Sequence, residues 1–246
     1  RLFRLVLFTV KEWANVKALY SNVLGFFGGI NLAIMTAWIC MNHPQVESPT
    51  ALLVFFFRRF ASWKWPEPLG LNPIQTKNPP GVPNMAVWDH NRDHFHLMPI
   101  LTPAYPCMNS SYNVGISQLR RIQEELNQTS IELQRSSQSQ QLLRNVLFTK
   151  SDFFQRYLHF LQVTIEADTE DFQEHFLRCQ NKLRFLVKSL ECKQDIQIWP
   201  YPRFFHESAQ KAYFFMGLRF SHGMDITTIS LHDHEQQQFD VKYVSQ

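Results

Sequence analysis

The 246-residue chain is poor in cysteine and glycine, and both shortages exclude classes of protein. Its four cysteines are widely spaced and include no C-x-x-C pair, so neither a zinc module nor a disulfide framework is predicted. Only eight glycines and thirteen prolines are present, which excludes a collagen-like or low-complexity chain. Hydrophobic residues make up 45% of the sequence, enough for one large domain or two ordinary domains with buried cores.

Acidic residues are scarce in the first quarter of the chain. Residues 1–65 carry seven Lys or Arg and two Asp or Glu, whereas the remainder carries seventeen and nineteen. This asymmetry favours an anionic partner for the first segment, and a solvated basic face without a partner explains it equally well.

No charged residue occurs between Ala18 and Val46, which raises the question of a membrane span. Small and polar residues interrupt this stretch, at Asn22, Gly28, Gly29, Asn31 and Thr36. We therefore predict a helix in the core of the protein and no membrane partner.

The first part of the chain is predicted to be helical. Apolar residues at helical spacing predict helices to about Leu19, over 30–41, from Pro49 to about 63, and over 117–136. Ser48 before Pro49 is typical of a helix start, because a capping hydroxyl precedes a proline at the first helical position. The Ser- and Gln-rich segment RSSQSQQ then predicts the end of a first domain spanning 1–145.

Residues 146–246 show a mixed pattern. Alternation over 156–167 predicts a strand, and 169–190 predicts an amphipathic helix. Three strand-like runs follow, IQIWPY, KAYFFMGLRF and ITTISLH, and the last segment, DHEQQQFDVKYVSQ, is predicted to be a helix. This order is typical of a small sandwich of the split βαβ kind, so the predicted fold class is α+β.

Both ends of the chain lack an expected feature. The first helix begins at Arg1 without a capping residue, and a final strand would normally follow the last predicted helix. We therefore expect this sequence to be part of a longer polypeptide.

Three segments carry a resemblance to a known family: KEWANVKALYSNVLGFFGGINLAIM, VWDHNRDHFHLMPILTPAYPCMNSSYNV and FFQRYLHFLQVTI. They resemble the central and C-terminal domains of the nuclear poly(A) polymerases of eukaryotes, in the same order and over nearly the whole chain. The resemblance implies a polynucleotide adenylyltransferase acting in mRNA polyadenylation in the nucleus. It also implies that residues 146–246 form an RNA-binding domain similar to the RNA-recognition motif (RRM).

The resemblance implies an ATP site around the first turn of the chain. Lys11 corresponds to a lysine that contacts the phosphates, and Tyr20 to a tyrosine whose hydroxyl donates to a phosphate or ribose oxygen. Gly29 and Ile30 fall where the backbone and a small aliphatic side chain meet the adenosine. Asn22 is expected to be a secondary polar contact.

Parts of this stretch would also suit a purely structural role, and parts differ from the family. Without the resemblance, Gly28 and Gly29 indicate close helix packing, and Lys11 indicates a solvated helix lysine. The family usually has G-G-V where this chain has Gly28, Gly29 and Ile30. Its basic W-A-K-R is W-A-N-V at 13–16, so the positive potential expected near the triphosphate is weaker.

Two residues are expected to contact RNA by the same resemblance. Asn113 corresponds to an asparagine that touches the RNA 3′ end, and Arg184 to an arginine near the strand. Arg184 would act mainly through phosphate, and an exposed helix arginine is the structural alternative.

Aromatic residues elsewhere are predicted to be core. The run KAYFFMGLRF superficially matches the aromatic third strand of an RRM, yet Phe214 and Phe215 cannot both face RNA from one strand. The aromatic clusters at 55–57 and at Trp63 and Trp65 are also predicted to be packed inside.

The resemblance places the catalytic chemistry outside this sequence. The family holds two divalent ions, Mg²⁺ or Mn²⁺, on carboxylates of an N-terminal domain that carries G-S followed by D-x-D. No such arrangement occurs here, so we predict no catalytic or metal residue and an inactive fragment. The expected partners are ATP, an RNA 3′ end, that N-terminal domain and 3′-end processing factors.

Other interpretations stay open. Three imidazoles and two carboxylates lie within eight residues, at Asp89, His90, Asp93, His94 and His96. They would suit zinc, whereas the resemblance makes His96 a packing residue. For the whole protein, the alternatives are a catalytically inactive paralogue or fragment that acts as an RNA-binding scaffold and, more remotely, a purely helical interaction protein.

Overall fold

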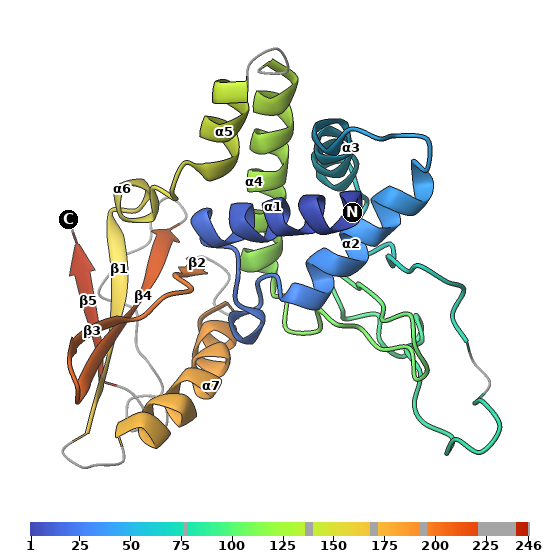
Figure 1. Ribbon diagram of the computed structural model, residues 1–246. Coiled ribbons are helices and arrows are strands. Elements are labelled where there is room, and N and C mark those ends of the chain that lie inside the picture. Colours follow the sequence, from blue (N-terminus) through green and yellow to red (C-terminus); the bar gives the residue numbers. More distant parts are fainter. Residues whose placement is uncertain (76–77, 136–139, 168–171, 192–195, 221–239, 246) are drawn as a thin grey trace. The chain divides into compact units, whose positions relative to one another are not determined.

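The computed structural model describes residues 1–75, 78–135, 140–167, 172–191, 196–220 and 240–245. The chain divides into two compact units, Arg1–Lys150 and Ser151–Gln246, and each is described by itself (Figure 1). The first unit is helical, and the second combines a helix with an antiparallel sheet. The predicted α+β fold class is therefore confirmed.

The first unit is built on five helices and one short 3-10 turn within the described residues. These are α1 (Leu2–Val16), η1 (Asn22–Leu24), α2 (Gly29–Asn42), α3 (Pro49–Ala61), α4 (Ile116–Arg135) and α5 (Gln140–Phe148). Helix α1 packs against α2 and α3, and α4 packs against α3 and α5 (Figure 1). Helix α3 begins as predicted, because the Ala51 N–H donates to the Ser48 hydroxyl and Pro49 takes the first helical position.

The core of this unit is aromatic. Trp13 of α1 is fully buried, its ring meets Phe57 of α3 edge to face at 4.9 Å, and its indole N–H donates to the Thr129 hydroxyl of α4 across 3.0 Å. Of the aromatic residues predicted to be packed inside, Phe56, Phe57 and Trp63 are buried, whereas Phe55 and Trp65 are half-buried. Burial of one aromatic side chain stabilises a fold by about 1.5–3 kcal/mol, so these rings fix how α1, α3 and α4 pack.

Helix α1 ends in a tight reversal at Ala18. The Leu19 N–H donates to the Ala14 carbonyl at 2.8 Å, and the Ala18 N–H donates to the Asn15 carbonyl at 3.2 Å. Ala18 has φ 58°, the left-handed conformation that glycine usually supplies in this Schellman motif. The reversal turns the chain so that Tyr20 follows α1 after only three non-helical residues.

Between α3 and α4, the described residues show little regular structure and are joined by main-chain hydrogen bonds. Leu69 donates to the Pro99 carbonyl at 2.9 Å and accepts from Leu101 at 2.8 Å. Trp88 donates to the Cys107 carbonyl at 2.7 Å, and both residues pack with Leu101 in a small buried cluster. These bonds and contacts hold the described part of a segment that is long for a connecting loop.

Within the described residues, the second unit is a five-stranded antiparallel sheet with helix α7 on one face. Its elements are α6 (Phe153–Arg156), β1 (His159–Glu166), α7 (Phe172–Glu191), β2 (Ile196–Pro200), β3 (Phe205–Ser208), β4 (Lys211–Phe220) and β5 (Asp240–Ser245). The strand order is β2-β4-β1-β5, and β3 pairs with the end of β4. Because β4 lies between β1 and β2 and is antiparallel to both, β1, α7 and β2 form the predicted split βαβ unit (Figure 1).

The two faces of the sheet differ along β4. Phe214 is fully buried and packs against Phe204, which in turn contacts Phe176 of α7. Phe215 is half-buried on the opposite face, in contact with the aromatic cluster around Phe153. This confirms the prediction that the two phenylalanines cannot share one face of the strand and that one of them is core.

The helix predicted over DHEQQQFDVKYVSQ is wrong for its last residues. Residues 240–245 form β5, which pairs with β1 from Thr164↔Asp240 to His159↔Ser245. The sequence D-V-K-Y-V-S alternates with period two, but the glutamine-rich run before it favours a helix and hides this signal. The predicted strand ITTISLH and residues 233–239 lie outside the described residues.

The apolar stretch from Ala18 to Val46 contributes η1 and α2 to the helical unit. Among the helices of the described ranges, none combines the length and the apolar character that crossing a membrane requires.

Candidate nucleotide and RNA site

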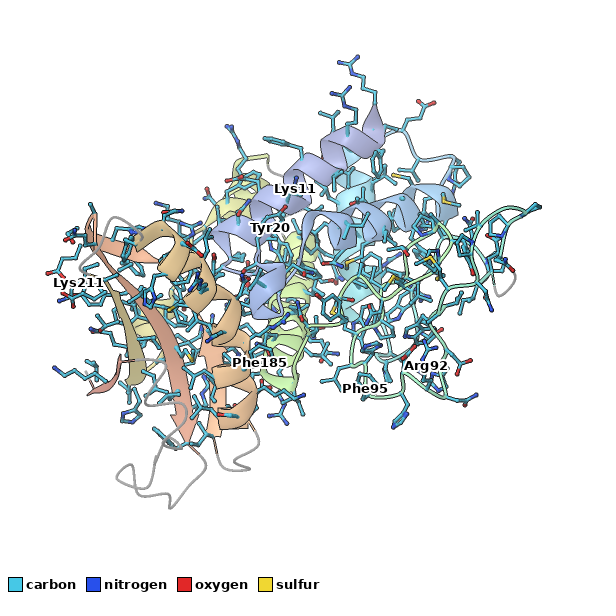
Figure 2. All side chains as sticks on the ribbon, turned by 90° about the horizontal axis from the view of Figure 1, so that it is seen from below. Lys11, Tyr20, Arg92, Phe95, Phe185 and Lys211 are labelled. Atoms are coloured by element: carbon cyan, nitrogen blue, oxygen red, sulfur yellow. The ribbon has the colours of Figure 1, made fainter. Side chains whose placement is uncertain are left out.

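Three of the predicted ATP residues converge in the first unit. The Lys11 ammonium lies 5.9 Å from the centre of the Tyr20 ring (Figure 2). A Cβ placed on Gly29 would lie 3.1 Å from the Tyr20 hydroxyl oxygen and 3.9 Å from Lys11 Nζ. The three residues are half-buried, so they form a surface that solvent reaches.

The local fold explains this convergence. The chain leaves α1 at Ala18 and returns at Phe27, whose N–H donates to the Leu19 carbonyl at 3.0 Å and which forms a parallel bridge with Tyr20. Tyr20 therefore lies beside the residues that open α2. Within the described residues Lys11 makes no salt bridge, which leaves its ammonium able to meet an anion.

The start of α2 presents bare backbone. Gly28 is the N-cap and has no side chain to cap the first turn, so the N–H groups there lack the usual hydroxyl or carboxylate partner. The Asn31 side chain instead accepts the Gly28 N–H at 2.6 Å. Ile30, in the first turn, is 50% exposed. A glycine N-cap beside a cation suits an anionic or polar ligand.

Asn22 lies next to this surface but is engaged in structure. Its side-chain amide donates to the Ser110 carbonyl at 3.1 Å, and the Ser110 hydroxyl accepts from the fully buried Asn31 at 2.7 Å. A Cβ on Gly28 would lie 3.2 Å from Asn22 Cβ. The side chain of Asn22 thus helps to fasten η1 to the 109–113 loop, and Asn31 fastens the start of α2 to the same loop.

Asn113, predicted to contact RNA, lies on that loop and meets Asn22. Its side-chain amide donates to the Asn22 main-chain carbonyl at 3.1 Å, and it is half-buried. Gly25 has φ 78°, and a Cβ there would lie only 2.5 Å from the Asn113 carbonyl oxygen. Only glycine fits this contact without displacement.

Arg184 belongs to the second unit, on α7. It is half-buried, and its guanidinium carbon lies 4.7 Å from the centre of the Phe185 ring. Phe185 is 58% exposed (Figure 2). The predicted RNA residues Asn113 and Arg184 therefore belong to separate compact units.

The histidine-rich segment is organised around a carboxylate. The Asp93 carboxylate accepts hydrogen bonds from the Arg92 guanidinium and from the Asp89 N–H, which lower its pKa from 3.8 to about 2. Burial lowers the pKa of His96, and its Nδ1 accepts the Trp88 indole N–H at 3.2 Å. His96 thus packs in this segment beside Trp88, as the resemblance implied.

Metal ligands are not assembled in the part of the chain that the structure describes. There, no group of three or more His, Cys, Asp or Glu side chains could hold an ion. The described residues therefore do not fit a Mg²⁺ or Mn²⁺ site.

Sequence reasoning missed three supporting residues. Asn31 and Ser110 join α2 to the 109–113 loop, and the Gln118 side chain donates to the Leu24 carbonyl at 3.0 Å. Asn31 lies three residues after the N-cap Gly28, the position from which a side chain accepts the N-cap N–H in a capping box. The sequence could therefore have predicted this role of Asn31. The hydrogen bonds from Asn31 to Ser110 and from Gln118 to Leu24 join residues far apart in the sequence, so no local pattern predicts them.

The two units match two family models. Residues 2–150 match the model described as "Poly(A) polymerase central domain", and residues 152–213 match "Poly(A) polymerase predicted RNA binding domain". The combination of a helical unit and an RRM-like sheet is therefore that of the central and RNA-binding domains of RNA 3′-adenylating enzymes.

Curated relatives agree over most of the chain. A "Poly(A) polymerase" of Dictyostelium discoideum is 37% identical over 229 residues, which cover 89% of this chain and 28% of the relative. "Nuclear poly(A) polymerase 4" of Arabidopsis thaliana is 37% identical over 249 aligned residues, covering 98% and 32%. "Nuclear poly(A) polymerase 2" of the same plant is 35% identical, covering 98% and 30%. The chain belongs to the poly(A) polymerase family and spans about a third of the length of these relatives.

Proposed function

We propose that this chain is the ATP- and RNA-binding portion of a polynucleotide adenylyltransferase, which adds AMP from ATP to the 3′ ends of RNA in mRNA polyadenylation. Divalent ions, Mg²⁺ or Mn²⁺, and their carboxylates belong to an N-terminal nucleotidyltransferase domain of the same protein. The 246 residues alone are therefore inactive. The enzyme works in the nucleus, with 3′-end processing factors as further partners.

The convergence of Lys11, Tyr20 and Gly29 is the observation that supports ATP binding most strongly. The Lys11 ammonium supplies charge for the phosphates, and the Tyr20 hydroxyl donates to a phosphate or ribose oxygen. Gly29 leaves the backbone open to the adenosine, and Ile30 adds exposed aliphatic surface beside it. Asn22 is a secondary contact, because its amide already bonds to Ser110.

In this proposal, each of the two units contributes a residue that contacts RNA. Asn113 touches the RNA 3′ end from the first unit, close to the ATP residues through its bond to Asn22. Arg184 contacts the strand from the second unit through phosphate, which contributes affinity and little sequence information. The description of the family model that matches residues 152–213 supports RNA binding there.

Lys11→Ala tests the nucleotide site. ATP binding to the 246-residue chain is measured first, and 3′ extension of oligoadenylate is measured after adding the nucleotidyltransferase domain of a relative. We expect Lys11→Ala to weaken ATP binding and raise the KM for ATP several-fold, whereas Lys64→Ala, an exposed lysine after α3, changes neither.

The outcomes separate the competing functions. An unchanged KM and ATP affinity for Lys11→Ala contradict its assignment. If the 246 residues alone extend RNA, the proposal that the catalytic residues lie in a separate nucleotidyltransferase domain is contradicted. RNA binding without any ATP binding favours the inactive scaffold over the enzyme.

A further inference from the structure

Phe185 lies at the centre of the solvent face of α7, where an apolar side chain is least expected. The buried face of this helix is formed by Phe172, Phe176, Cys179, Leu183, Leu186, Val187 and Leu190. At 100° per residue, Phe185 points away from the middle of that face. Its ring is 58% exposed, so it contributes little to the core of the unit.

Cations surround this ring. Lys182 and Lys188 are exposed and lie three residues before and after Phe185, which places them as its neighbours on the helix surface. The Arg184 guanidinium carbon lies 4.7 Å from the ring centre, a cation–π contact. Arg178 is also exposed but is paired with Glu174.

The charge of this helix face is opposite to that of its unit. Residues 151–246 carry ten Lys or Arg and thirteen Asp or Glu, yet 175–190 contain four of the basic residues and no acidic one. Such a local excess of positive charge in an acidic unit indicates an anionic ligand.

The sheet face opposite α7 also offers aromatic surface, and it carries cations as well, since the Arg219 guanidinium carbon lies 5.0 Å from the centre of the Trp199 ring and Lys242 is exposed. Phe154, Tyr201, Phe205 and Phe215 contact one another there, within 5.3–5.8 Å between ring centres. At the edge of this face, Lys211 is shared between the carboxylates of Glu166 and Glu207, at 3.2 and 3.8 Å. Among the described residues of the second unit, α7 is distinguished by an exposed ring with lysines on both sides and no acidic residue between 175 and 190 to balance them.

We propose that the outer face of α7 holds single-stranded RNA, with Phe185 stacked on a base and Lys182 and Lys188 on the phosphates to either side. This inference rests on the RNA binding proposed above and adds the surface that carries it. Aromatic stacking tolerates any base, and lysines track the backbone, so the contact gives affinity without sequence preference.

The test uses the whole 246-residue chain and a short fluorescein-labelled oligoadenylate, whose binding is followed by fluorescence anisotropy. We expect Phe185→Ala and Phe185→Leu to weaken binding on the order of tenfold, and Phe185→Tyr to retain it, because only a ring stacks. The double variant K182Q/K188Q should reduce the slope of log K against log salt by about 1.4. Thermal unfolding of each variant verifies that the fold is intact.

Matched variants on the opposite sheet face are Phe205→Ala and Lys242→Gln, an exposed phenylalanine and an exposed lysine. We expect both to bind like the unaltered chain. If Phe185→Ala and K182Q/K188Q bind normally, or if only the sheet variants lose binding, the assignment to α7 is overturned while RNA binding stands. If the unaltered chain binds no oligoadenylate, both this inference and the RNA-binding part of the proposed function are overturned.

Discussion

Asn113 donates its side-chain amide to the main-chain carbonyl oxygen of Asn22 across 3.1 Å, although 91 residues of sequence separate them. Asn22 is proposed as a secondary contact to ATP, and Asn113 is proposed to touch the RNA 3′ end. One hydrogen bond therefore links the two proposed substrate sites. Gly25, three residues after Asn22, packs against the Asn113 backbone and completes the connection.

Gly25→Ala should strongly destabilise the first unit. Its φ of 78° disfavours any side chain, and the new Cβ would lie 2.5 Å from the Asn113 carbonyl oxygen. We expect a loss of about 2–5 kcal/mol in the free energy of unfolding, measured by urea titration. Gly81→Ala is the control, since Gly81 has φ 76° but open space around it and should lose only about 1–2 kcal/mol. Equal losses would refute the contact.

Gly29→Ala should impair ATP binding and leave the fold intact. Alanine is compatible with the helical backbone at this position, but its methyl group would press on the Tyr20 hydroxyl at 3.1 Å. We expect ATP affinity to fall several-fold by calorimetry with an unchanged melting temperature. Gly28→Ala adds the same methyl group against Asn22 and Asn31 instead, so its effect should fall mainly on stability. A normal ATP affinity for Gly29→Ala would argue against the site.

Glu125→Gln should destabilise the first unit far more than Glu124→Gln. The Glu125 carboxylate is buried between the Arg121 guanidinium and the Lys17 ammonium, the latter at 3.8 Å. Removing its charge leaves buried cations uncompensated, which typically costs about 3–5 kcal/mol. Glu124 also faces Arg121 but is 49% exposed, so its neutralisation should change stability by about 0.5 kcal/mol or less. Chemical denaturation of both variants decides the comparison.

The Asp93 carboxylate should give a stability contribution that depends on acid pH. Its pKa is lowered from 3.8 in an ordinary aspartate to about 2, first by the Arg92 hydrogen bond. A lowered pKa in the folded state stabilises the fold above about pH 4, and this contribution is lost as the pH falls toward 2. The difference in unfolding free energy between the unaltered chain and Asp93→Asn should therefore be constant at neutral pH and shrink below pH 4. A pH-independent difference would exclude this mechanism.

The sequence predicted those features that depend on neighbouring residues or that lie within one contiguous family-like segment. Lys11 and Tyr20 could be named because they lie in one contiguous segment that resembles a family, and α3 because Ser48 and Pro49 mark its start. The engagement of the Asn22 amide by Ser110 could not be predicted, since that bond spans 88 residues. Elements α6 and β3 have four residues each, too few to show a period. Residues 240–245 were misassigned because their alternation is short and follows a helix-favouring run.

Trp13 lies two residues after Lys11 on α1, and its bond to Thr129 anchors this helix on α4. The helix cannot slide along its neighbour without breaking that buried bond. The reach of the Lys11 ammonium therefore depends on the length of its own flexible stem, which starts from a fixed Cα. An arginine at this position would keep the charge but alter both length and shape, and the anchored backbone could not retreat to compensate. The buried packing of α1 therefore determines whether the protein can accept an arginine in place of Lys11.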